Sequence, residues 1–280
     1  MINDDLLDLA VKVAKAAGSE ILDVYEQAGD VEVTVKQDNS PLTQADQRAH
    51  NLIVRELTRG TPEIPVLSEE SEQISFTERR SWSRYWLVDP LDGTKEFVKR
   101  NGEFTVNIAL IDQGRPILGV VYVPVTGVTY HGLVGQGAYK QEANGESISI
   151  QCQSIESNQK DLKVVASRSH RGAGLDGLLD TLNQQFSAVE LVSMGSSLKI
   201  CLVAEGKADL YPRFAPTCEW DTAAAHAVLI AAGGVLVSTH FQILHYNTKA
   251  ELLNPFFIAI ADNNYPWQKT MGLNNDSKQD

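Results

Sequence analysis

The sequence feature that most restricts the possible folds of this chain is the alternation of apolar and polar residues between positions 104 and 150. Four runs, TVNIALI, ILGVVYV, GVTYHGLV and AYKQEA, follow one another with glycines and Pro124 between them. Alternation with a period of two is typical of strands, and short glycine-containing turns connect antiparallel neighbours. The segment therefore predicts an antiparallel meander. Gly135 and Gly137 are interpreted as hairpin turns, because no G-x-G-x-x-G pattern follows them.

Two helices are expected before this meander. Apolar residues recur at helical spacing from about residue 4 to 27, and a second helical pattern begins after Thr43. Asp46 lies three residues after Thr43, as in an imperfect capping box, and Gly60 and Pro62 end the pattern. The rest of this half is assigned to short strands at 31–35, 65–67 and 85–88, a polar loop at 37–41, and a helix or turn at 76–83.

After a polar, unpatterned segment at 154–161 the sequence changes to alternating strands and helices, which is typical of an α/β arrangement. We expect two sub-domains, 1–155 and 156–265, and a tail, 266–280, in which residues 274–280 are disordered. The expected elements are strands at 164–166, 189–194, 208–211, 234–237 and 256–261, and helices at 175–186, 197–205 and 221–232.

Composition bounds the function. A chain of 280 residues with 43% hydrophobic residues can bury a sizeable core. Its net charge of −12 argues against a general nucleic-acid surface, although bound cations can still attract a phosphorylated ligand. Cys152, Cys201 and Cys218 lack C-x-x-C spacing, which favours inert thiols in a reducing compartment and excludes neither one disulfide nor a free thiol. With no secretory signal and no run of roughly 18 apolar residues, we expect a cytoplasmic protein.

Acidic residues on a turn form the centre of the candidate site. In WLVDPLDGTKEF, an apolar strand end leads to Asp89 and Asp92, and Pro90 stiffens the turn between them. Two carboxylates so placed suit a hard divalent cation. The amides of Gly93 and Thr94 can face an anion if a helical turn starts there. The stretch therefore predicts a cation and a phosphate side by side.

Asp46, Glu69 and Asp221 also lie at element ends beside apolar residues. Taken singly, each has a structural explanation: Asp221 as a helix N-cap, Glu69 as a solvated loop residue, and the aspartate pair as turn residues bonded to their own backbone. Together these carboxylates suffice for two Mg²⁺ ions with room for water and phosphate. Spacing alone leaves both the structural explanations and the metal-binding explanation open.

Three motifs resemble those of a known enzyme superfamily. DPLDGT at 89–94 resembles the D-P-[IL]-D-G-T signature of the inositol monophosphatase superfamily. WDTAA at 220–224 resembles its second signature, W-D-x-A-A, and SEE at 68–70 its upstream E-E element. The order and separations also match, and the resemblance spans nearly the whole chain to Ala261.

Further residues resemble one branch of this superfamily. KEF at 95–97 is similar to the 3′(2′),5′-bisphosphate nucleotidases, whereas inositol monophosphatases usually show T-N-F there. GSSLK at 195–199 and LNP at 253–255 are similar to the bacterial members of that branch. The chain departs from the pattern at His226, a variable helix position, and near 238–244, which lacks an acid-x-x-Gly turn.

The resemblance implies an α+β or α/β layered sandwich, with alternating α-β-α-β-α layers and the site between two sub-domains. It also implies Mg²⁺ as cofactor, with two or three ions. Glu69, Asp89 and the Leu91 carbonyl are expected to hold the first ion. Asp89, Asp92 and Asp221 are expected to hold the second, so that only Asp221 comes from the second sub-domain.

The resemblance also assigns the phosphate contacts and the catalytic roles. The amides of Gly93 and Thr94 are expected to receive the scissile phosphate, beside Glu69, Leu91, Asp92 and Asp221. Thr94, oriented by Asp46, and Glu69 are expected to position the attacking water. Candidates to bind the rest of the substrate are Lys36, Arg168, Ser196, Lys199, Arg213 and the loop at 167–172, for which surface charge or helix capping is an equally good explanation.

The activity implied is hydrolysis of adenosine 3′,5′-bisphosphate (PAP) to AMP and phosphate, with Li⁺ inhibition, a link to sulfate activation, and PAPS as a second substrate. The alternative is an inositol-phosphate or sugar-phosphate phosphatase of the same superfamily. A non-catalytic sensor of metal and nucleotide is disfavoured, because a pure binder need not retain Thr94 and the complete acid set. The implied partner is a small nucleotide, with neither nucleic acid nor an integral membrane segment. Peripheral attachment at the inner membrane and the oligomeric state stay open.

Overall fold

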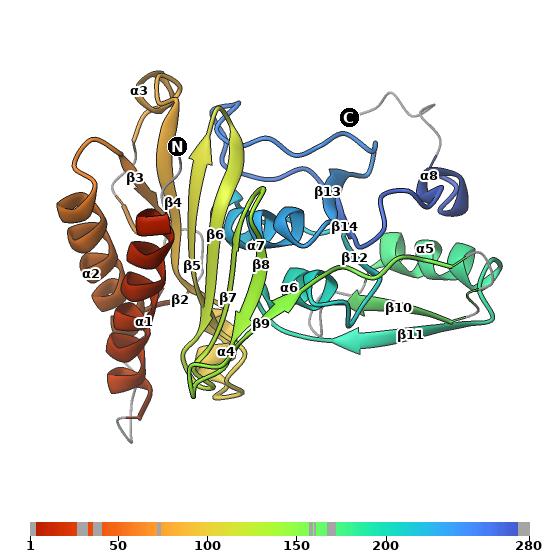
Figure 1. Cartoon of the computed structure of the whole chain (residues 1–280), viewed down its shortest axis with the longest axis horizontal. Helices are drawn as coiled ribbons and strands as arrows, with labels where there is room; N and C mark the ends of the chain where they lie inside the picture. Colours follow the sequence, from red (N-terminus) through yellow and green to blue (C-terminus); the bar gives the residue numbers. More distant parts are fainter. Residues whose placement is uncertain are drawn as a thin grey trace.

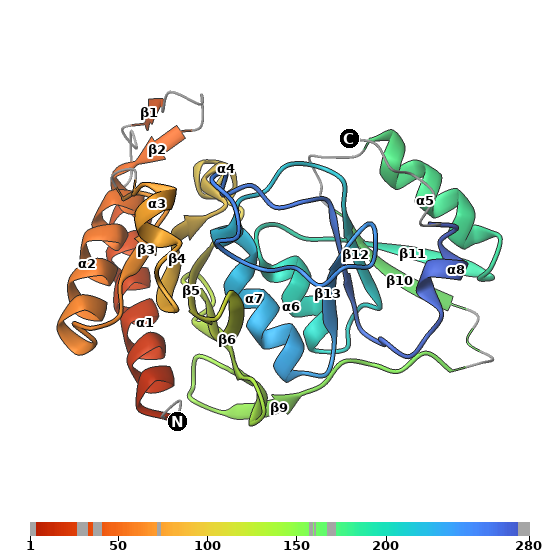
Figure 2. The ribbon, with the colours of Figure 1, turned by 90° about the horizontal axis from the view of Figure 1, so that it is seen from above.

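The computed structural model describes residues 4–26, 33–35, 41–71, 74–156, 159, 161–166 and 172–273 of the chain. Helices and sheets alternate in the order helix, sheet, helix, sheet, helix, as Figures 1 and 2 show from two directions. This is the α-β-α-β-α layered sandwich implied by the resemblance, and that prediction is confirmed.

The first sheet contains the meander. Its seven strands lie in the order β3 (Val66–Ser68), β4 (Arg84–Asp92), β5 (Thr105–Asp112), β6 (Arg115–Val123), β7 (Val128–Leu133), β8 (Gly137–Gln141) and β9 (Ser147–Ile150). Strand β3 is parallel to β4, and all the other pairs are antiparallel, which confirms the predicted meander. Strand β4 runs further than expected, because Asp92 still pairs with Thr105 after a register shift. Pro90 lies within that shift and has no N–H to donate.

Two long helices cover the outer face of this sheet. Helices α1 (Asp4–Glu26) and α2 (Gln44–Gly60) pack against each other and against β4, β5 and β6. Ala10, Ala14, Ala17, Ile53 and Leu57 are fully buried, because their spacing places them on one face of each helix. Both helices confirm the sequence prediction.

Four short elements lie around these helices. Strands β1 (Val33–Val35) and β2 (Pro41–Thr43) pair antiparallel, so the end of the expected polar loop is a strand. The rest of that loop, at 37–40, lies outside the described residues. Helices α3 (Phe76–Arg79) and α4 (Thr94–Val98) flank β4 on its two sides in the sequence.

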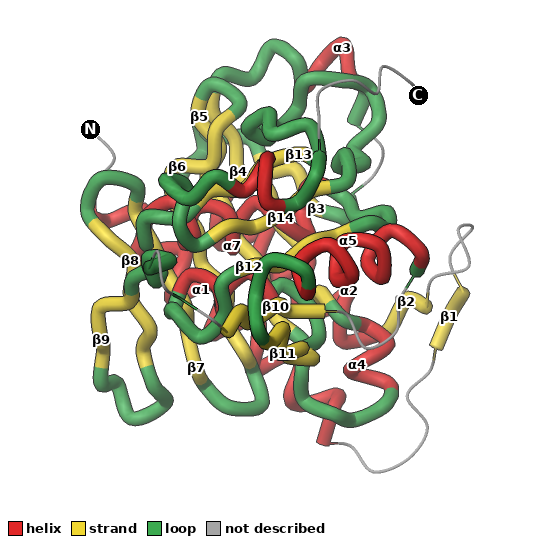
Figure 3. Tube along the Cα trace, turned by 90° about the vertical axis from the view of Figure 1, so that its right-hand side faces the viewer, coloured by secondary structure: helices red, strands yellow, loops and turns green. Residues whose placement is uncertain are grey.

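The second sheet is mixed. Its strands lie in the order β11 (Ala188–Ser193), β10 (Asp161–Ala166), β12 (Leu210–Arg213), β14 (Phe257–Ile260) and β13 (Val235–Ser238). The first three are parallel, and β14 is antiparallel to both of its neighbours. Helix α5 (Ala173–Asn183) lies on the outer side of this sheet, which faces the viewer in Figure 3. Each strand and helix of this half falls near its predicted position.

Helix α8 (Trp267–Thr270) is an element that the sequence analysis did not expect. It lies in the segment assigned to the tail. Trp267 is buried, stacks with Phe186 and contacts the tilted ring of Tyr265, so this part of the chain packs into the core beside the second sheet. The predicted disorder at 274–280 falls outside the described residues.

Helices α6 (Leu198–Ala204) and α7 (Glu219–Ala231) fill the layer between the sheets. Helix α7 is rich in alanine and lies directly on the strands of the first sheet. A Cβ added at Gly119 of β6 would lie 2.0 Å from the Ala224 carbonyl oxygen, so only glycine allows this approach. Helix α7 belongs to the second half of the chain, yet it packs against β4, β5 and β6 of the first sheet. The sub-domain boundary near residue 155 stays a prediction.

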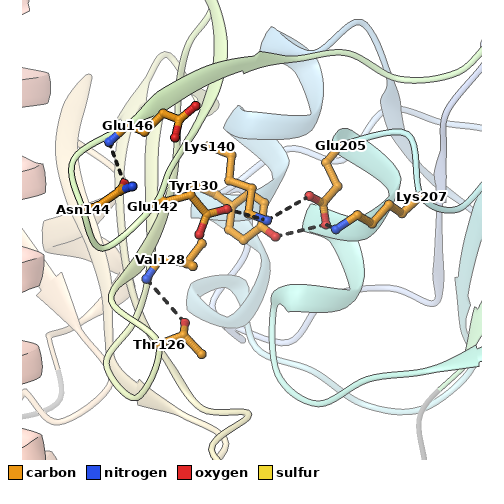
Figure 4. A network of polar contacts seen from close by, with 9 residues as sticks. All are labelled: Thr126, Val128, Tyr130, Lys140, Glu142, Asn144, Glu146, Glu205 and Lys207. Carbon is orange, nitrogen blue, oxygen red and sulfur yellow. Dashed lines mark hydrogen bonds and ion pairs between the residues drawn. The ribbon is translucent and has the colours of Figure 1, made fainter.

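A buried carboxylate joins α6 to the first sheet. The Glu205 side chain, 4% exposed, accepts a hydrogen bond from the Tyr130 hydroxyl at 3.0 Å. Lys140 approaches it at 3.6 Å and Lys207 at 3.2 Å, and Lys140 also pairs with Glu142 (Figure 4). The network ties the end of α6 to β7 and β8.

No helix within the described ranges is long and apolar enough to cross a membrane.

Candidate active site

Three carboxylates meet where the two halves of the molecule adjoin. Carboxylate oxygens of Glu69, Asp89 and Asp221 all lie within 4.8 Å of one another. The first two are neighbours because β3 and β4 are parallel: Ser68 pairs with Val88, and each acid follows directly. The Glu69 N–H donates to the Val88 carbonyl at 3.1 Å, which continues this pairing beyond the end of β3.

Asp221 is held by the first turn of α7. The helix begins at Glu219, two residues before the predicted start, with Cys218 as its N-cap. Asp221 is therefore the third residue of the helix and not its N-cap. Its Oδ2 accepts a hydrogen bond from the Cys218 N–H at 2.8 Å, which forms one half of a capping box. The Asp221 carboxylate also belongs to the acidic cluster.

Asp92 is fixed by a residue of β5 and by the residue before α6. Its Oδ2 accepts from the Ser197 N–H at 2.6 Å and from Asn107 Nδ2 at 3.4 Å. Asn107 Oδ1 in turn accepts from the hydroxyls of Ser197, at 2.9 Å, and Thr105, at 3.1 Å. Asp92 lies outside the compact group of three acids, although its charge acts on Asp89 and Asp221. Asn107 and Ser197 were not among the residues predicted to support Asp92.

The acidic cluster suits a bound cation. Burial raises the pKa of Asp89 well above its ordinary value, and the nearby carboxylates of Glu69 and Asp92 raise it further. The pKa of Asp221 is raised for the same reasons, by burial first and by Asp92 next. Buried carboxylates that repel one another are stabilised in the ionised form by a bound metal. Oxygen donors of this kind fit Mg²⁺, so the residues present suit the cofactor implied by the resemblance.

Asp46, Leu91 and the start of α4 surround this cluster. Asp46 is 2% exposed at the start of α2, and its charge acts on Asp89. The Leu91 N–H donates to Asp89 Oδ1 at 3.0 Å. Gly93 has a φ of +98°, a backbone conformation that favours glycine, and α4 begins at the half-buried Thr94 directly after it. The first amides of a helix have no intrahelical acceptor, so those of α4 can bind an anion here.

A cavity of about 140 Å³ extends from the acids to a basic side. Asp92 and Asp221 lie on its lining together with Ser196, Lys199 and Arg213, so three of the predicted substrate-binding residues share one space with the acids. Tyr211, Ile200 and Phe257 are also among its lining residues and were missed by the sequence analysis. The other candidates, Lys36, Arg168 and most of the 167–172 loop, lie outside the described residues.

Lys199 is a buried cation. It is 7% exposed, and its Nζ lies 5.6 Å from the centre of the Tyr211 ring. Burial lowers the pKa of Lys199 to about 8, while the Asp92 carboxylate acts in the opposite direction. A cation so placed is poorly solvated and gains from a phosphate nearby.

None of the cysteines forms a disulfide. Burial raises the pKa of Cys152 to about 12 and raises the pKa of Cys201 well above its ordinary value. Both thiols are therefore protonated near neutral pH and poor nucleophiles, in line with the expectation of inert thiols.

Comparison with known proteins agrees with the motifs. Residues 2–275 match the Inositol monophosphatase family. The 3′(2′),5′-bisphosphate nucleotidase CysQ of Escherichia coli (strain K12) is 50% identical over 252 residues, which are 90% of this chain and 98% of that protein. The protein of the same name from Salmonella typhimurium (strain LT2) is 49% identical over the same shares.

Solved structures match over the same length. The crystal structure of CysQ from Bacteroides thetaiotaomicron, described as a bacterial member of the inositol monophosphatase family, superposes with a TM-score of 0.81. It is 44% identical and covers 92% of this chain and 98% of its own. An IMPase of Thermotoga maritima has a TM-score of 0.73 at 21% identity over 96% of each chain, a likeness in fold alone.

Proposed function

The chain belongs to the inositol monophosphatase family, and we propose that it is a Mg²⁺-dependent enzyme that hydrolyses the 3′-phosphate of adenosine 3′,5′-bisphosphate to AMP and phosphate. One observation carries the proposal: a single cavity has the carboxylates Asp92 and Asp221 on its lining together with Lys199 and Arg213. This suits a substrate with two phosphates, one cleaved beside the acids and one held by the cations. The relatives named as 3′(2′),5′-bisphosphate nucleotidases support it.

The basic side of the cavity favours the nucleotide over an inositol ester. An inositol monophosphate has no second phosphate, so Lys199 would stay buried without an anionic ligand. Arg213 is anchored by bonds from its guanidinium to the Ala215 and Pro216 carbonyls, both 3.2 Å long. Its remaining N–H groups are donors for phosphate oxygens. Ser196 is the third proposed contact on this side.

The acids are proposed to hold two or three Mg²⁺ ions. Glu69, Asp89 and the Leu91 carbonyl would hold the first, and Asp89, Asp92 and Asp221 the second. When bound, Mg²⁺ lowers the pKa of a water molecule and neutralises phosphate oxygens.

The chain's own residues are proposed to position the reactants. Thr94 and Glu69 would hold the attacking water in line with the scissile bond, and Asp46 would orient the Thr94 hydroxyl. The Gly93 and Thr94 amides would bind the oxygens of the phosphate, and a water would give its proton to the leaving ribose oxygen. Positioning and electrostatic stabilisation are sufficient for such a reaction, so no covalent phospho-enzyme is required.

The same chemistry extends to a related substrate. PAPS also carries a 3′-phosphate on its ribose, and we propose that the enzyme converts it to APS. The protein would then act in the cytoplasm, including the inner face of the membrane, on nucleotides that arise in sulfate activation.

A substrate comparison tests the proposal. Purified protein is assayed for phosphate release from adenosine 3′,5′-bisphosphate and inositol 1-phosphate, with Mg²⁺ titration and Li⁺ as inhibitor. We expect the higher kcat/KM on the nucleotide; a higher value on the inositol ester would refute the substrate assignment. Asp92→Asn should abolish turnover while keeping the fold, and the exposed Asp176→Asn serves as its control. Full activity in Asp92→Asn would contradict the two-metal assignment.

A further inference from the structure

A segment after the second sheet's β13 crosses the first turn of α7. We call residues 246–254 the clasp. Its backbone bonds to that turn at two points: the Glu219 N–H donates to the Leu252 carbonyl, and the Asn254 N–H donates to the Thr217 carbonyl, both at 2.8 Å. The first bond satisfies an N–H that has no acceptor within the helix. The clasp therefore supports the N-terminus of the helix that carries Asp221.

The side chain of Asn254 forms hydrogen bonds at the same end of the helix. Its Nδ2 donates to the Cys218 carbonyl at 2.6 Å and lies 3.1 Å from the hydroxyl oxygens of Thr217 and Thr222. Cys218 is also the residue whose N–H donates to Asp221 Oδ2. The Asn254 amide thus fixes the peptide group that contains the Cys218 carbonyl, and the neighbouring peptide group contains the Cys218 N–H that orients Asp221.

Arg79 joins the clasp to helix α3. It belongs to α3, is 2% exposed, and its guanidinium donates to Asn247 Oδ1 and to the carbonyls of Lys249, at 3.1 Å, and Ala250. In return Asn247 Nδ2 donates to the Arg79 carbonyl at 2.6 Å, and the Asn247 N–H donates to Glu219 Oε2 at 2.8 Å. Strand β4, which carries Asp89, begins a few residues after Arg79. The contacts therefore form a path from α3, which precedes β4 in the sequence, to the first turn of α7, and this path does not pass through the acidic cluster.

We propose that Arg79 and Asn254 are positioning residues for the metal site, which hold Asp221 within reach of Glu69 and Asp89. The proposal rests on the metal role of these three carboxylates described above. Like charges at this distance repel one another, so the acids must be held together by structure before an ion binds. Groups that orient metal ligands in this way commonly change metal affinity by about 10–100-fold when they are altered.

Two variants test the clasp, each with a matched control. Asn254→Leu keeps the shape of the side chain and removes its donors, and Asn144→Leu makes the same change at the exposed turn before β9. Arg79→Lys keeps the charge and removes the planar fork that reaches three acceptors, and Arg80→Lys makes that change on the exposed neighbour. Mg²⁺ binding to metal-free protein is measured by isothermal titration calorimetry and expressed per folded molecule, with near-UV circular dichroism for the folded fraction.

We expect each clasp variant to bind Mg²⁺ about 10–100-fold more weakly, with the controls unchanged. Loss of thermal stability with unaltered Mg²⁺ affinity per folded molecule would show a merely structural role and overturn the proposal. Asp221→Asn is the reference. If Asp221→Asn loses affinity and the clasp variants do not, the positioning inference alone fails; if Asp221→Asn binds Mg²⁺ normally, the assigned metal role fails. Asn254→Ser, which keeps a shorter donor, should fall between the parent and Asn254→Leu.

Discussion

We expect His226 to make the protein less stable in mild acid. The imidazole lies on α7, is 1% exposed, and its Nδ1 is 2.9 Å from the Tyr246 hydroxyl oxygen. Its Nε2 is buried without a hydrogen-bond partner among the described residues. Burial, with a smaller effect of His245, lowers the pKa of His226 to about 3 from the ordinary value of 6.5.

The sign and size of the effect follow from proton linkage. Below pH 6.5 the unfolded chain binds a proton at this position, whereas the folded chain does not until about pH 3. The stabilisation is therefore present above pH 6.5 and is lost as the pH falls through this window. At pH 5 the loss is about 2 kcal/mol, which lowers Tm by about 3 °C for a chain of this length.

Urea unfolding at pH 7 and pH 5, at constant ionic strength, measures the difference. The parent protein is compared with His226→Gln and with His240→Gln, which alters an exposed histidine. We expect the pH-dependent loss to shrink by about 2 kcal/mol in His226→Gln only. Carboxylates with raised pKa shift stability in the opposite direction, but they do so in all three proteins and cancel. An identical pH dependence in the parent and His226→Gln would refute the argument.

Four other outcomes are expected. Asp89→Asn should abolish turnover yet raise the Tm of the metal-free protein in scanning fluorimetry, because it removes one repelling charge; a lower Tm would contradict this. Mg²⁺ at 100 times its Kd should stabilise the parent by about 2.7 kcal/mol, reversibly with chelator, and an unchanged Tm would exclude the site. Lys199→Met should raise the KM for adenosine 3′,5′-bisphosphate at least about tenfold more than that for adenosine 3′-monophosphate, and equal changes in steady-state kinetics would remove Lys199 from the second phosphate. Gly119→Ala should cost about 1–3 kcal/mol or more in urea unfolding, because its Cβ would meet the Ala224 carbonyl. Gly177→Ala in α5 should not lower stability in the same measurement, because a Cβ there would meet open space.

Local patterns were sufficient for most elements of this fold. The helices α1 and α2 and the strands of the meander have an amphipathic period that is visible in the sequence, and the structure confirms them. The motifs DPLDGT and WDTAA were sufficient for the family, and KEF, GSSLK and LNP pointed to its bisphosphate nucleotidase branch; the relatives confirm both. The roles assigned to the site residues stay predictions, although the structure gathers Glu69, Asp89 and Asp221 at one point.

What was missed depends on contacts between distant residues. Strand β4 continues through Asp92 because Thr105 lies opposite, which no local pattern around Pro90 indicates. Helix α8 is held by aromatic contacts of Trp267. Asn107 is a buried polar residue in the run TVNIALI, and this was the one available signal; its partner Ser197 lies 90 residues further along the chain. Cys218 is an unusual N-cap residue, so the start of α7 could be placed only from the bonds that it makes.

The position of α7 between the two sheets also sets the order in which the enzyme can be assembled during synthesis. The first sheet, with Glu69 and Asp89, can leave the ribosome complete while the chain from α7 onward is still unmade. The inner face of the first sheet is then not yet covered by α7, and contacts between residues so distant in sequence form slowly. The three carboxylates of the acidic cluster therefore come together only after α7 has been made and has packed between the sheets. A truncated product that ends before α7 retains Glu69 and Asp89 but lacks Asp221.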